Sequence, residues 1–231
     1  MKIMVINPNS SQSMTRHLRE VLEGVKRADT ELTVTGLEQG PQTLECSYDN
    51  ALAVPPMLEL VRRANREGYD AVIIAAFCDP GLDAAREVSG ILVLGLEETT
   101  LHVAAMLGSR YSVVSMTDQH VEHKHQEIAK YKLERSLASV RPLELTVAQT
   151  DSEPELTKQR VMEVARLAVR EDKAEVLVLG CAGMAGYAAE IERQLEGVVV
   201  LDPSTVTLKL CEAMVDGGIK HAKRSLYACP R

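Results

Sequence analysis

The chain has 231 residues, 45% of them hydrophobic, which suffices for one large α/β domain or two smaller ones with a core that needs no disulfide or metal. A net charge of −7 and the scarcity of aromatic residues, with no Trp and one Phe, argue against a nucleic-acid partner. No apolar run approaches the roughly 18 residues of a membrane span, and five scattered cysteines without a C-x-x-C pair favour a reduced, cytoplasmic setting.

Short apolar runs alternate with longer segments of helical period along the chain. Strands are predicted at residues 2–6, 32–37, 71–76, 91–95, 111–115, 142–147, 175–179 and 198–201. Helices are predicted between them, at residues 11–25, 50–67, 81–88, 97–107, 119–131, 153–171, 185–195 and 204–215. This alternation is typical of a mostly parallel sheet wrapped by helices, so the predicted fold class is α/β.

An internal similarity predicts how this α/β chain is divided. The segment AVIIAAFCDPGLDAARE, from Ala71, aligns without a gap with AEVLVLGCAGMAGYAAE, from Ala174, and places Cys78 on Cys181. We therefore expect two similar α/β halves with parallel sheets, one of residues 1–96 plus 208–231 and one of residues 97–207. Because open α/β sheets bind ligands at the carboxyl ends of their strands, we expect an active-site cleft between the halves.

Cys181 is the strongest candidate for chemistry. It ends a predicted strand, lies in the small-residue turn GCAGMAG that begins at Gly180, and precedes a predicted helix. Backbone N–H groups of the turn, together with the helix dipole, would favour a thiolate that acts as a base. The same turn, with Gly180, Ala182 and Gly183, is predicted to contact the substrate and to stabilise a developing enolate. The alternative is a small buried residue at a tight turn.

Cys78 is the natural partner of Cys181. Racemisation through a planar intermediate needs one group to remove a proton and a second group on the opposite face to return one. A thiolate and a thiol would meet that need. The next residue, Asp79, starts the turn Asp-Pro-Gly and is predicted either to contact substrate or to cap the helix that follows.

Polar side chains follow two other predicted strands. Asn7 and Asn9 come after the first strand, and Ser115 and Thr117 stand at the equivalent place in the second half. Their amides and hydroxyls could bind a carbonyl or carboxylate of a substrate. Asn9 could equally cap the next helix.

Two other patterns carry less information. In His120-Val-Glu-His-Lys-His125, only His120 and His123 share a helix face, so a metal site is not expected. The glycines between Gly180 and Gly186 match neither of the usual phosphate-binding patterns.

Blocks of sequence along the whole chain resemble one known family. They are INPNS followed by Met14-Thr15, FCDPGLDAARE, GLEETTLHVA, YSVV, VLGCAGMA and VLDPSTVTLKLCEAMV. With these blocks the chain is similar to the hydantoin and allantoin racemases of the aspartate/glutamate racemase superfamily. The resemblance implies two flavodoxin-like halves, no cofactor, a catalytic cysteine at Cys181, and substrate contacts from Asn7 and Asn9.

The resemblance also shows departures from the family pattern. The family's first cysteine would fall on Ala76, whereas this chain has its cysteine at Cys78. Alternate residues of an extended strand point to the same side, so Cys78 is expected to reach the same place from one step further along. The two Thr that often follow the fifth strand are here Ser115 and Met116.

These observations predict a cofactor-independent racemase or epimerase of a small carbon acid, such as a 5-substituted hydantoin or allantoin. The enzyme is expected to be a homo-oligomer without a metal or a membrane partner. Two alternatives stay open. One is a decarboxylase or cis-trans isomerase that uses mainly Cys181, and the other is a ligand-binding or nucleotide-binding α/β protein without activity.

Overall fold

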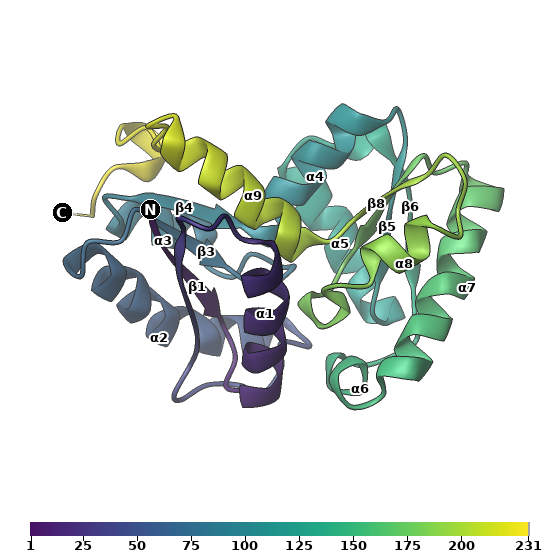
Figure 1. Ribbon diagram of the computed structural model, residues 1–231, viewed down its shortest axis with the longest axis horizontal. Helices are drawn as coiled ribbons and strands as arrows, with labels where there is room; N and C mark the ends of the chain where they lie inside the picture. Colours follow the sequence, from purple (N-terminus) through teal and green to yellow (C-terminus); the bar gives the residue numbers. More distant parts are fainter. Residues whose placement is uncertain (231) are drawn as a thin grey trace. The chain divides into compact units, whose positions relative to one another are not determined.

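The computed structural model describes residues 1–230, which form two compact units (Figure 1). Unit 1 consists of Met1–Leu96 and the segment from Thr207 onward, and unit 2 consists of Glu97–Val206. Among the described residues, no helix combines the length and the apolar character that crossing a bilayer requires.

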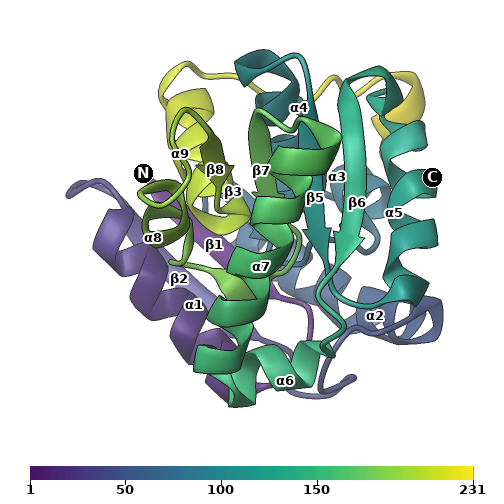
Figure 2. The same cartoon turned by 90° about the vertical axis from the view of Figure 1, so that its right-hand side faces the viewer.

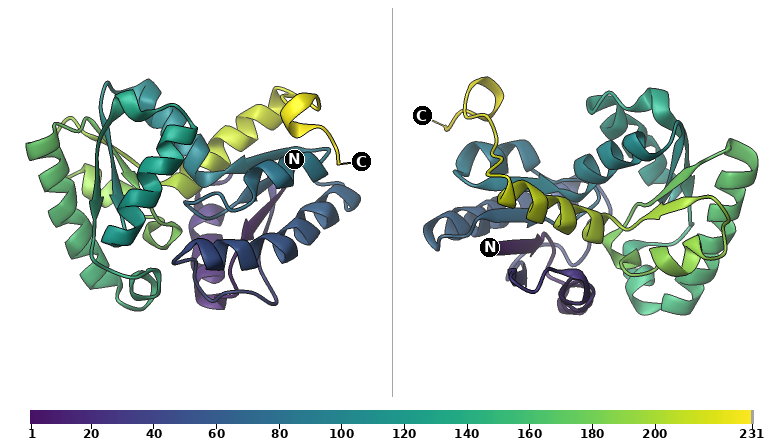
Figure 3. Two further views of the ribbon diagram at one scale, coloured as in Figure 1. Left: turned by 180° about the vertical axis from the view of Figure 1, so that it is seen from behind. Right: turned by 45° about the horizontal axis from the view of Figure 1, so that its top comes forward.

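Unit 1 contains a four-stranded parallel sheet with the strand order β2-β1-β3-β4. Its elements are β1 (Lys2–Asn7), α1 (Gln12–Val25), β2 (Glu31–Gly36), α2 (Ser47–Arg66), β3 (Ala71–Ile74), α3 (Leu82–Val88), β4 (Leu92–Gly95), α9 (Pro203–Asp216), which begins in unit 2, and a 3-10 turn (Ser225–Tyr227). Helices cover both faces of the sheet (Figures 1 and 3).

The core of unit 1 follows from alternation along the strands. Met4 and Ile6 of β1 and Ile74 of β3 belong to one buried cluster with Met57 and Val61 of α2. The strands β3 and β4 are buried along their whole length. A sheet that is covered on both faces therefore explains the continuous apolar runs of the sequence.

Unit 2 repeats this topology with the strand order β6-β5-β7-β8, again all parallel. Its elements are α4 (Leu96–Leu107), β5 (Tyr111–Ser115), α5 (Asp118–Lys130), β6 (Leu137–Pro142), α6 (Val147–Ser152), α7 (Pro154–Asp172), β7 (Val176–Leu179), α8 (Ala188–Glu192), β8 (Val199–Leu201), and 3-10 turns at Glu134–Ser136 and Ala182–Met184. Helix α7 crosses one face of the sheet, and α5 lies on the other (Figure 2). The predicted fold class, α/β with two similar flavodoxin-like halves and parallel sheets, is confirmed.

Unit 2 also corrects the predicted secondary structure at two places. The sixth strand spans Leu137–Pro142, not residues 142–147, and α6 was not predicted. In β6, Ser139 bonds to Ser112 and Arg141 bonds to Asp172 of α7, so polar side chains interrupt the apolar pattern of this edge strand. In the same unit, the buried Glu97 carboxylate at the start of α4 accepts a hydrogen bond from the buried Lys124 at 3.0 Å.

Candidate active site

In each unit, the predicted site residues follow the two central strands. In unit 1, β2 lies on one side of β1, and the chain then crosses to place β3 on the other side. In unit 2, β6 and β7 lie on opposite sides of β5 in the same way. This reversal of direction is a topological switch point, and α/β sheets commonly bind ligands at the carboxyl ends of the strands beside such a point. Asn7 ends β1 and Asn9 follows it, while Ser115 ends β5 and Thr117 follows it. Cys78 follows β3, and Cys181 follows β7.

Cys181 lies just beyond the carboxyl end of β7, with a fractional exposure of 7%. The N–H of Gly180 still belongs to the sheet, because it donates to the Val114 carbonyl at 2.8 Å. The Cys181 Sγ atom accepts a hydrogen bond from the backbone N–H of Gly183 at 3.3 Å. A backbone N–H directed at sulfur favours the thiolate over the thiol.

The source of that N–H differs from the prediction. Cys181 precedes a 3-10 turn of three residues, Ala182–Met184, and α8 begins only at Ala188. Such a short turn has no helix macrodipole of consequence, so the local N–H of Gly183 replaces the expected dipole. Thus the hydrogen bond to the Cys181 sulfur depends on where the turn holds Gly183.

Two contacts fix the position of this turn. A Cβ atom on Gly183 would lie 2.6 Å from Thr150 Oγ1, so only glycine allows α6 to pack this closely. At the far end of the turn, the N–H of Gly186 donates to the buried Asp202 carboxylate at 2.7 Å. The Asp202 carboxylate also accepts hydrogen bonds from the N–H groups of Ser204 and Thr205, which links the turn to the start of α9.

Ser115 offers a polar atom next to the Cys181 turn. Its side chain is 1% exposed, and its Oγ has no hydrogen-bond partner within the described part of the chain. Because β5 and β7 are neighbours in the sheet, Ser115 and the Cys181 turn leave the same sheet edge side by side. Thr117 is engaged otherwise, since its Oγ1 bonds to His120 Nδ1 at 2.8 Å.

In unit 1, Cys78 lies in a tight turn and not in an extended strand as expected. The N–H of Asp79 donates to the Ala76 carbonyl at 3.1 Å and closes the turn. Ala76 and Cys78 are half-buried while Phe77 is buried between them. The Cys78 Sγ atom donates to Asn50 Oδ1 of α2 at 3.4 Å.

Asp79 adopts the left-handed region with φ of 41°, an uncommon conformation for a residue other than glycine. Its side chain is buried, and its carboxylate packs against Gly95 at the end of β4, where a Cβ atom would lie 2.3 Å from Asp79 Oδ1. The predicted helix cap is wrong, since α3 begins after Gly81 without a side-chain cap. Asp79 instead holds the Cys78 turn against β4.

The amide groups of Asn7 and Asn9 are engaged within unit 1. Asn7 Nδ2 donates to Asn9 Oδ1 at 2.8 Å and to Thr15 Oγ1 at 2.9 Å. Asn9 Oδ1 also accepts from the N–H of Ser11 at 2.9 Å. These contacts shape the loop between β1 and α1, while contact of either residue with a substrate stays a prediction.

The register of the two sheets corrects the internal alignment. The N–H of Ala75 donates to the Ile6 carbonyl of β1, as the N–H of Gly180 donates to the Val114 carbonyl of β5. Ala75 is therefore the equivalent of Gly180, and Ala76 is the equivalent of Cys181. The gapless alignment of Cys78 with Cys181 is wrong by two residues, because β3 pairs from Ala71 and β7 from Val176.

The remaining cysteines have other surroundings. Cys211 is fully buried in α9, and its burial, together with the nearby Glu212 carboxylate, raises the pKa of the thiol to about 12. Cys46 Sγ donates to Asp49 Oδ2, and Cys229 is exposed. Among residues 1–230, no three His, Cys, Asp or Glu side chains gather in a way that could hold a metal ion.

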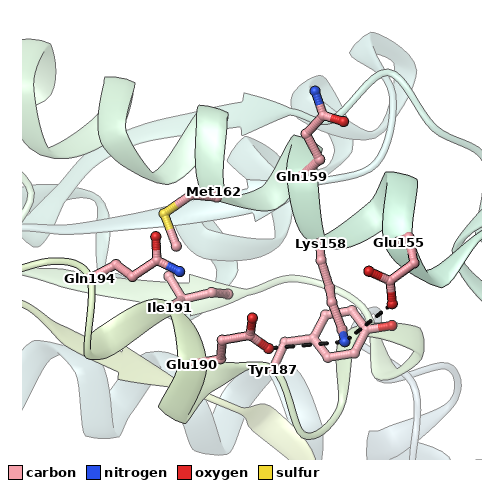
Figure 4. Close-up of a pocket in the computed structure, with 8 residues that line it drawn as sticks. All are labelled: Glu155, Lys158, Gln159, Met162, Tyr187, Glu190, Ile191 and Gln194. Atoms are coloured by element: carbon pink, nitrogen blue, oxygen red, sulfur yellow. Dashed lines mark hydrogen bonds and ion pairs between the residues drawn. The ribbon is translucent and has the colours of Figure 1, made fainter.

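A surface groove of about 400 Å³ lies between α7 and α8 of unit 2 (Figure 4). Lys158 of α7 forms an ion pair with Glu155 on the same helix and another with Glu190 of α8 across the groove. The Lys158 Nζ atom lies 5.5 Å from the centre of the Tyr187 ring. None of the predicted site residues lines this groove. The charged side chains of the groove are paired with one another, and no cysteine among the described residues lines the groove.

Sequence reasoning missed three residues that support the site: Asn50, Gly95 and Thr150. Each contacts a site loop from a distant part of the chain, so no local pattern marks it. Asp202 carries a signal that could have been used. An Asp directly before Pro203 is typical of a helix start, and Asp202 begins α9 in this way.

Comparisons with known proteins place the chain in a family. A family model described as Asp/Glu/hydantoin racemase matches residues 3–211. A hydantoin racemase of a Pseudomonas species is 35% identical, covering 100% of this chain and 92% of the relative. The structure of the allantoin racemase from Klebsiella pneumoniae matches with a TM-score of 0.96 at 31% identity, covering 100% of this chain and 94% of the other.

The allantoin racemase from Pseudomonas fluorescens gives a TM-score of 0.94 at 32% identity, covering 100% of this chain and 97% of the other. Full-length matches at this level of identity confirm the resemblance that the sequence blocks indicated. The chain thus belongs to the Asp/Glu/hydantoin racemase family and is a racemase, one of the isomerases.

Proposed function

We propose that this racemase inverts the stereocentre of a small cyclic ureide, a 5-substituted hydantoin or allantoin, by proton transfer through cysteine thiols. The relatives that carry the names hydantoin racemase and allantoin racemase support this choice of substrate. The observation that carries the mechanism is the position of Cys181 beyond β7, with a backbone N–H donated to its sulfur. That environment suits a thiolate base.

The proposed reaction moves one proton in and one proton out. The Cys181 thiolate removes the proton from the stereocentre and becomes a thiol, and the electron pair of the C–H bond moves onto the adjacent carbonyl to give an enolate. The Cys78 thiol then donates its proton to the opposite face of the carbon and becomes a thiolate. The opposite enantiomer reacts with the two roles exchanged. Nothing is oxidised or reduced, and the adjacent carbonyl holds the electron pair of the broken C–H bond, so the proposed step uses no cofactor.

The developing enolate oxygen needs hydrogen-bond donors. The candidates are the backbone N–H groups of Ala182 and Gly183 and the hydroxyl of Ser115, whose Oγ is buried and has no hydrogen-bond partner among residues 1–230. A buried hydroxyl with unused bonding capacity is the kind of group that a substrate oxygen satisfies. A cytoplasmic, homo-oligomeric enzyme that works without a cofactor also stays part of this proposal.

The experiment is deuterium exchange at the stereocentre of enantiopure hydantoins and allantoin, with enzyme-free samples to correct for spontaneous exchange. Cys181→Ser is expected to lower the exchange rate by about 10²–10⁴-fold, because it removes the general base. Cys211→Ser is the matched control, since its sulfur is sealed in the core. Full exchange by Cys181→Ser would overturn the assignment. A different result would favour the decarboxylase alternative. In that case the parent enzyme would not racemise these substrates but would consume a diacid, and Cys78→Ala would keep that activity.

A further inference from the structure

The two thiols of the proposed mechanism meet opposite hydrogen-bond environments. Cys181 Sγ accepts a hydrogen bond from the N–H of Gly183 at 3.3 Å. Cys78 Sγ donates a hydrogen bond to Asn50 Oδ1 at 3.4 Å. A donor directed at sulfur favours the charged thiolate, whereas an amide oxygen that accepts the S–H proton favours the neutral thiol.

We propose that Asn50 is a positioning residue that keeps Cys78 protonated, so that the resting enzyme carries the thiolate on Cys181 and the thiol on Cys78. This inference rests on the proposed function, because it assigns the starting protonation states of that same proton transfer. Asn50 acts on Cys78 alone and contacts no reacting atom of the substrate.

The first turn of α2 holds Asn50 in place. The N–H of Asn50 donates to the Cys46 carbonyl at 3.1 Å, within the first turn of the helix. In the same turn, the Asp49 carboxylate accepts a hydrogen bond from the N–H of Glu45 at 3.0 Å. The side chain of Asn50 therefore projects from an anchored turn, and its carbonyl oxygen stays available to the thiol.

Exposure and protonation state predict opposite orders of thiol reactivity. Cys78 is half-buried and Cys181 is 7% exposed, so accessibility alone makes Cys78 the faster to react. Alkylation by iodoacetamide requires the thiolate, so the proposed protonation states make Cys181 the faster thiol near neutral pH. The order of alkylation thus separates the two explanations.

The proposal also predicts a change in the pH dependence of racemisation. The active enzyme has one thiolate and one thiol, so activity is lost on the alkaline side when the remaining thiol ionises. Without the Asn50 carbonyl, Cys78 ionises more readily. The alkaline limb of kcat/KM is therefore expected to move to lower pH in Asn50→Leu, while the acidic limb stays in place.

The experiment measures iodoacetamide alkylation of each cysteine against pH by peptide mass spectrometry, in the full chain and three variants. Asn50→Leu is expected to raise the alkylation rate of Cys78 by roughly two- to tenfold near neutral pH, because the loss of one neutral hydrogen bond corresponds to a change of that size. Asn50→Asp keeps an acceptor and adds a negative charge, so the rate at Cys78 is expected at or below that of the parent. Asn65→Leu is the control, because Asn65 lies on the same helix but bonds to Val61 and Ser89.

Each outcome decides the proposal. Faster alkylation of Cys78 in Asn50→Leu alone supports it. Three results would overturn it. One is an equal rate of Cys78 alkylation in the parent and in Asn50→Leu, and another is alkylation of Cys78 before Cys181 in the parent. The third is faster alkylation of Cys78 in both Asn50 variants, which would indicate only a loosened turn. These measurements need no substrate. If Cys78→Ser proves fully active while the alkylation pattern holds, the role of Cys78 in the proposed function fails and the protonation assignment survives.

Discussion

At the scale of single residues, the surroundings of each sulfur atom determine what the thiol can do. Cys181 and Cys211 are both buried, yet a backbone N–H contacts the sulfur of Cys181, while burial and the Glu212 carboxylate raise the pKa of Cys211 to about 12. Low exposure alone therefore does not decide reactivity, because the thiolate must also be stabilised.

This contrast gives a direct prediction about chemical modification. Near neutral pH, iodoacetamide is expected to alkylate Cys181 and to leave Cys211 unmodified, and peptide mass spectrometry of the folded chain measures both. The denatured chain provides the control, since both thiols should then react at similar rates. Modification of Cys211 in the folded chain at the rate of Cys181 would contradict the assignment.

A second prediction concerns the glycine that supplies the N–H to Cys181. Gly183→Ala would bring a Cβ atom within 2.6 Å of Thr150 Oγ1, so the turn must move away from α6 and carry its N–H with it. We expect a loss of about 1–3 kcal/mol in stability and a lower kcat. The double variant Gly183→Ala with Thr150→Ala removes the clash and should recover part of kcat. No recovery would show that the contact with Thr150 does not set the position of the turn.

At the scale of secondary-structure elements, the edge strand β6 is tied to α7 by charged side chains. Arg141 Nε donates to Asp172 Oδ2 at 2.5 Å, and Ser139 Oγ donates to the same oxygen at 2.6 Å. The hydrogen bond from Arg141, with a further one from Ser139, lowers the pKa of Asp172 below its ordinary value of 3.8. The carboxylate therefore stabilises the folded state only when it is charged.

The sign of the pH effect follows from that lowered pKa. A depressed carboxyl pKa contributes stability that is present above the ordinary value and is lost as the pH falls through the folded-state value. Asp172→Asn is expected to reduce the free energy of unfolding by about 1 kcal/mol near neutral pH. Urea titrations at decreasing pH should show this difference begin to shrink near the ordinary carboxyl pKa of 3.8 and disappear only below the lower folded-state pKa. A difference that stays constant into acid would mean that the charge of Asp172 plays no part.

The same elements show what could be predicted from sequence. Strands such as β3 and β7 are continuous apolar runs, so their places and Cys181 beyond β7 could be predicted. The strand β6 was misplaced because Ser139 and Arg141 interrupt its pattern and depend on a partner in α7. The contact of Asn50 with Cys78 spans 28 residues of sequence and depends on how α2 packs, which no local pattern reveals.

At the scale of the whole molecule, one topology occurs twice. Both sheets have the same strand order, and in each unit a cysteine follows the third strand. The register of the sheets nevertheless makes Ala76 the equivalent of Cys181, and Cys78 lies two residues further along. The fold is thus close to symmetric while the positions and hydrogen bonds of the two thiols differ. Under the proposed mechanism, the two enantiomers of a substrate would therefore be deprotonated by two unlike thiols.

The central claim is that two different thiols serve opposite faces of one carbon, and racemisation in D₂O tests it most directly. Enantiopure substrate is converted to a small extent, the enantiomers are separated by chiral chromatography, and mass spectrometry gives the deuterium content of each. If one thiol removes the proton and the other delivers a deuteron, the product enantiomer should carry deuterium. The unreacted substrate enantiomer should keep its original hydrogen. Product that retains the original hydrogen would show a single group working on both faces and would contradict the account.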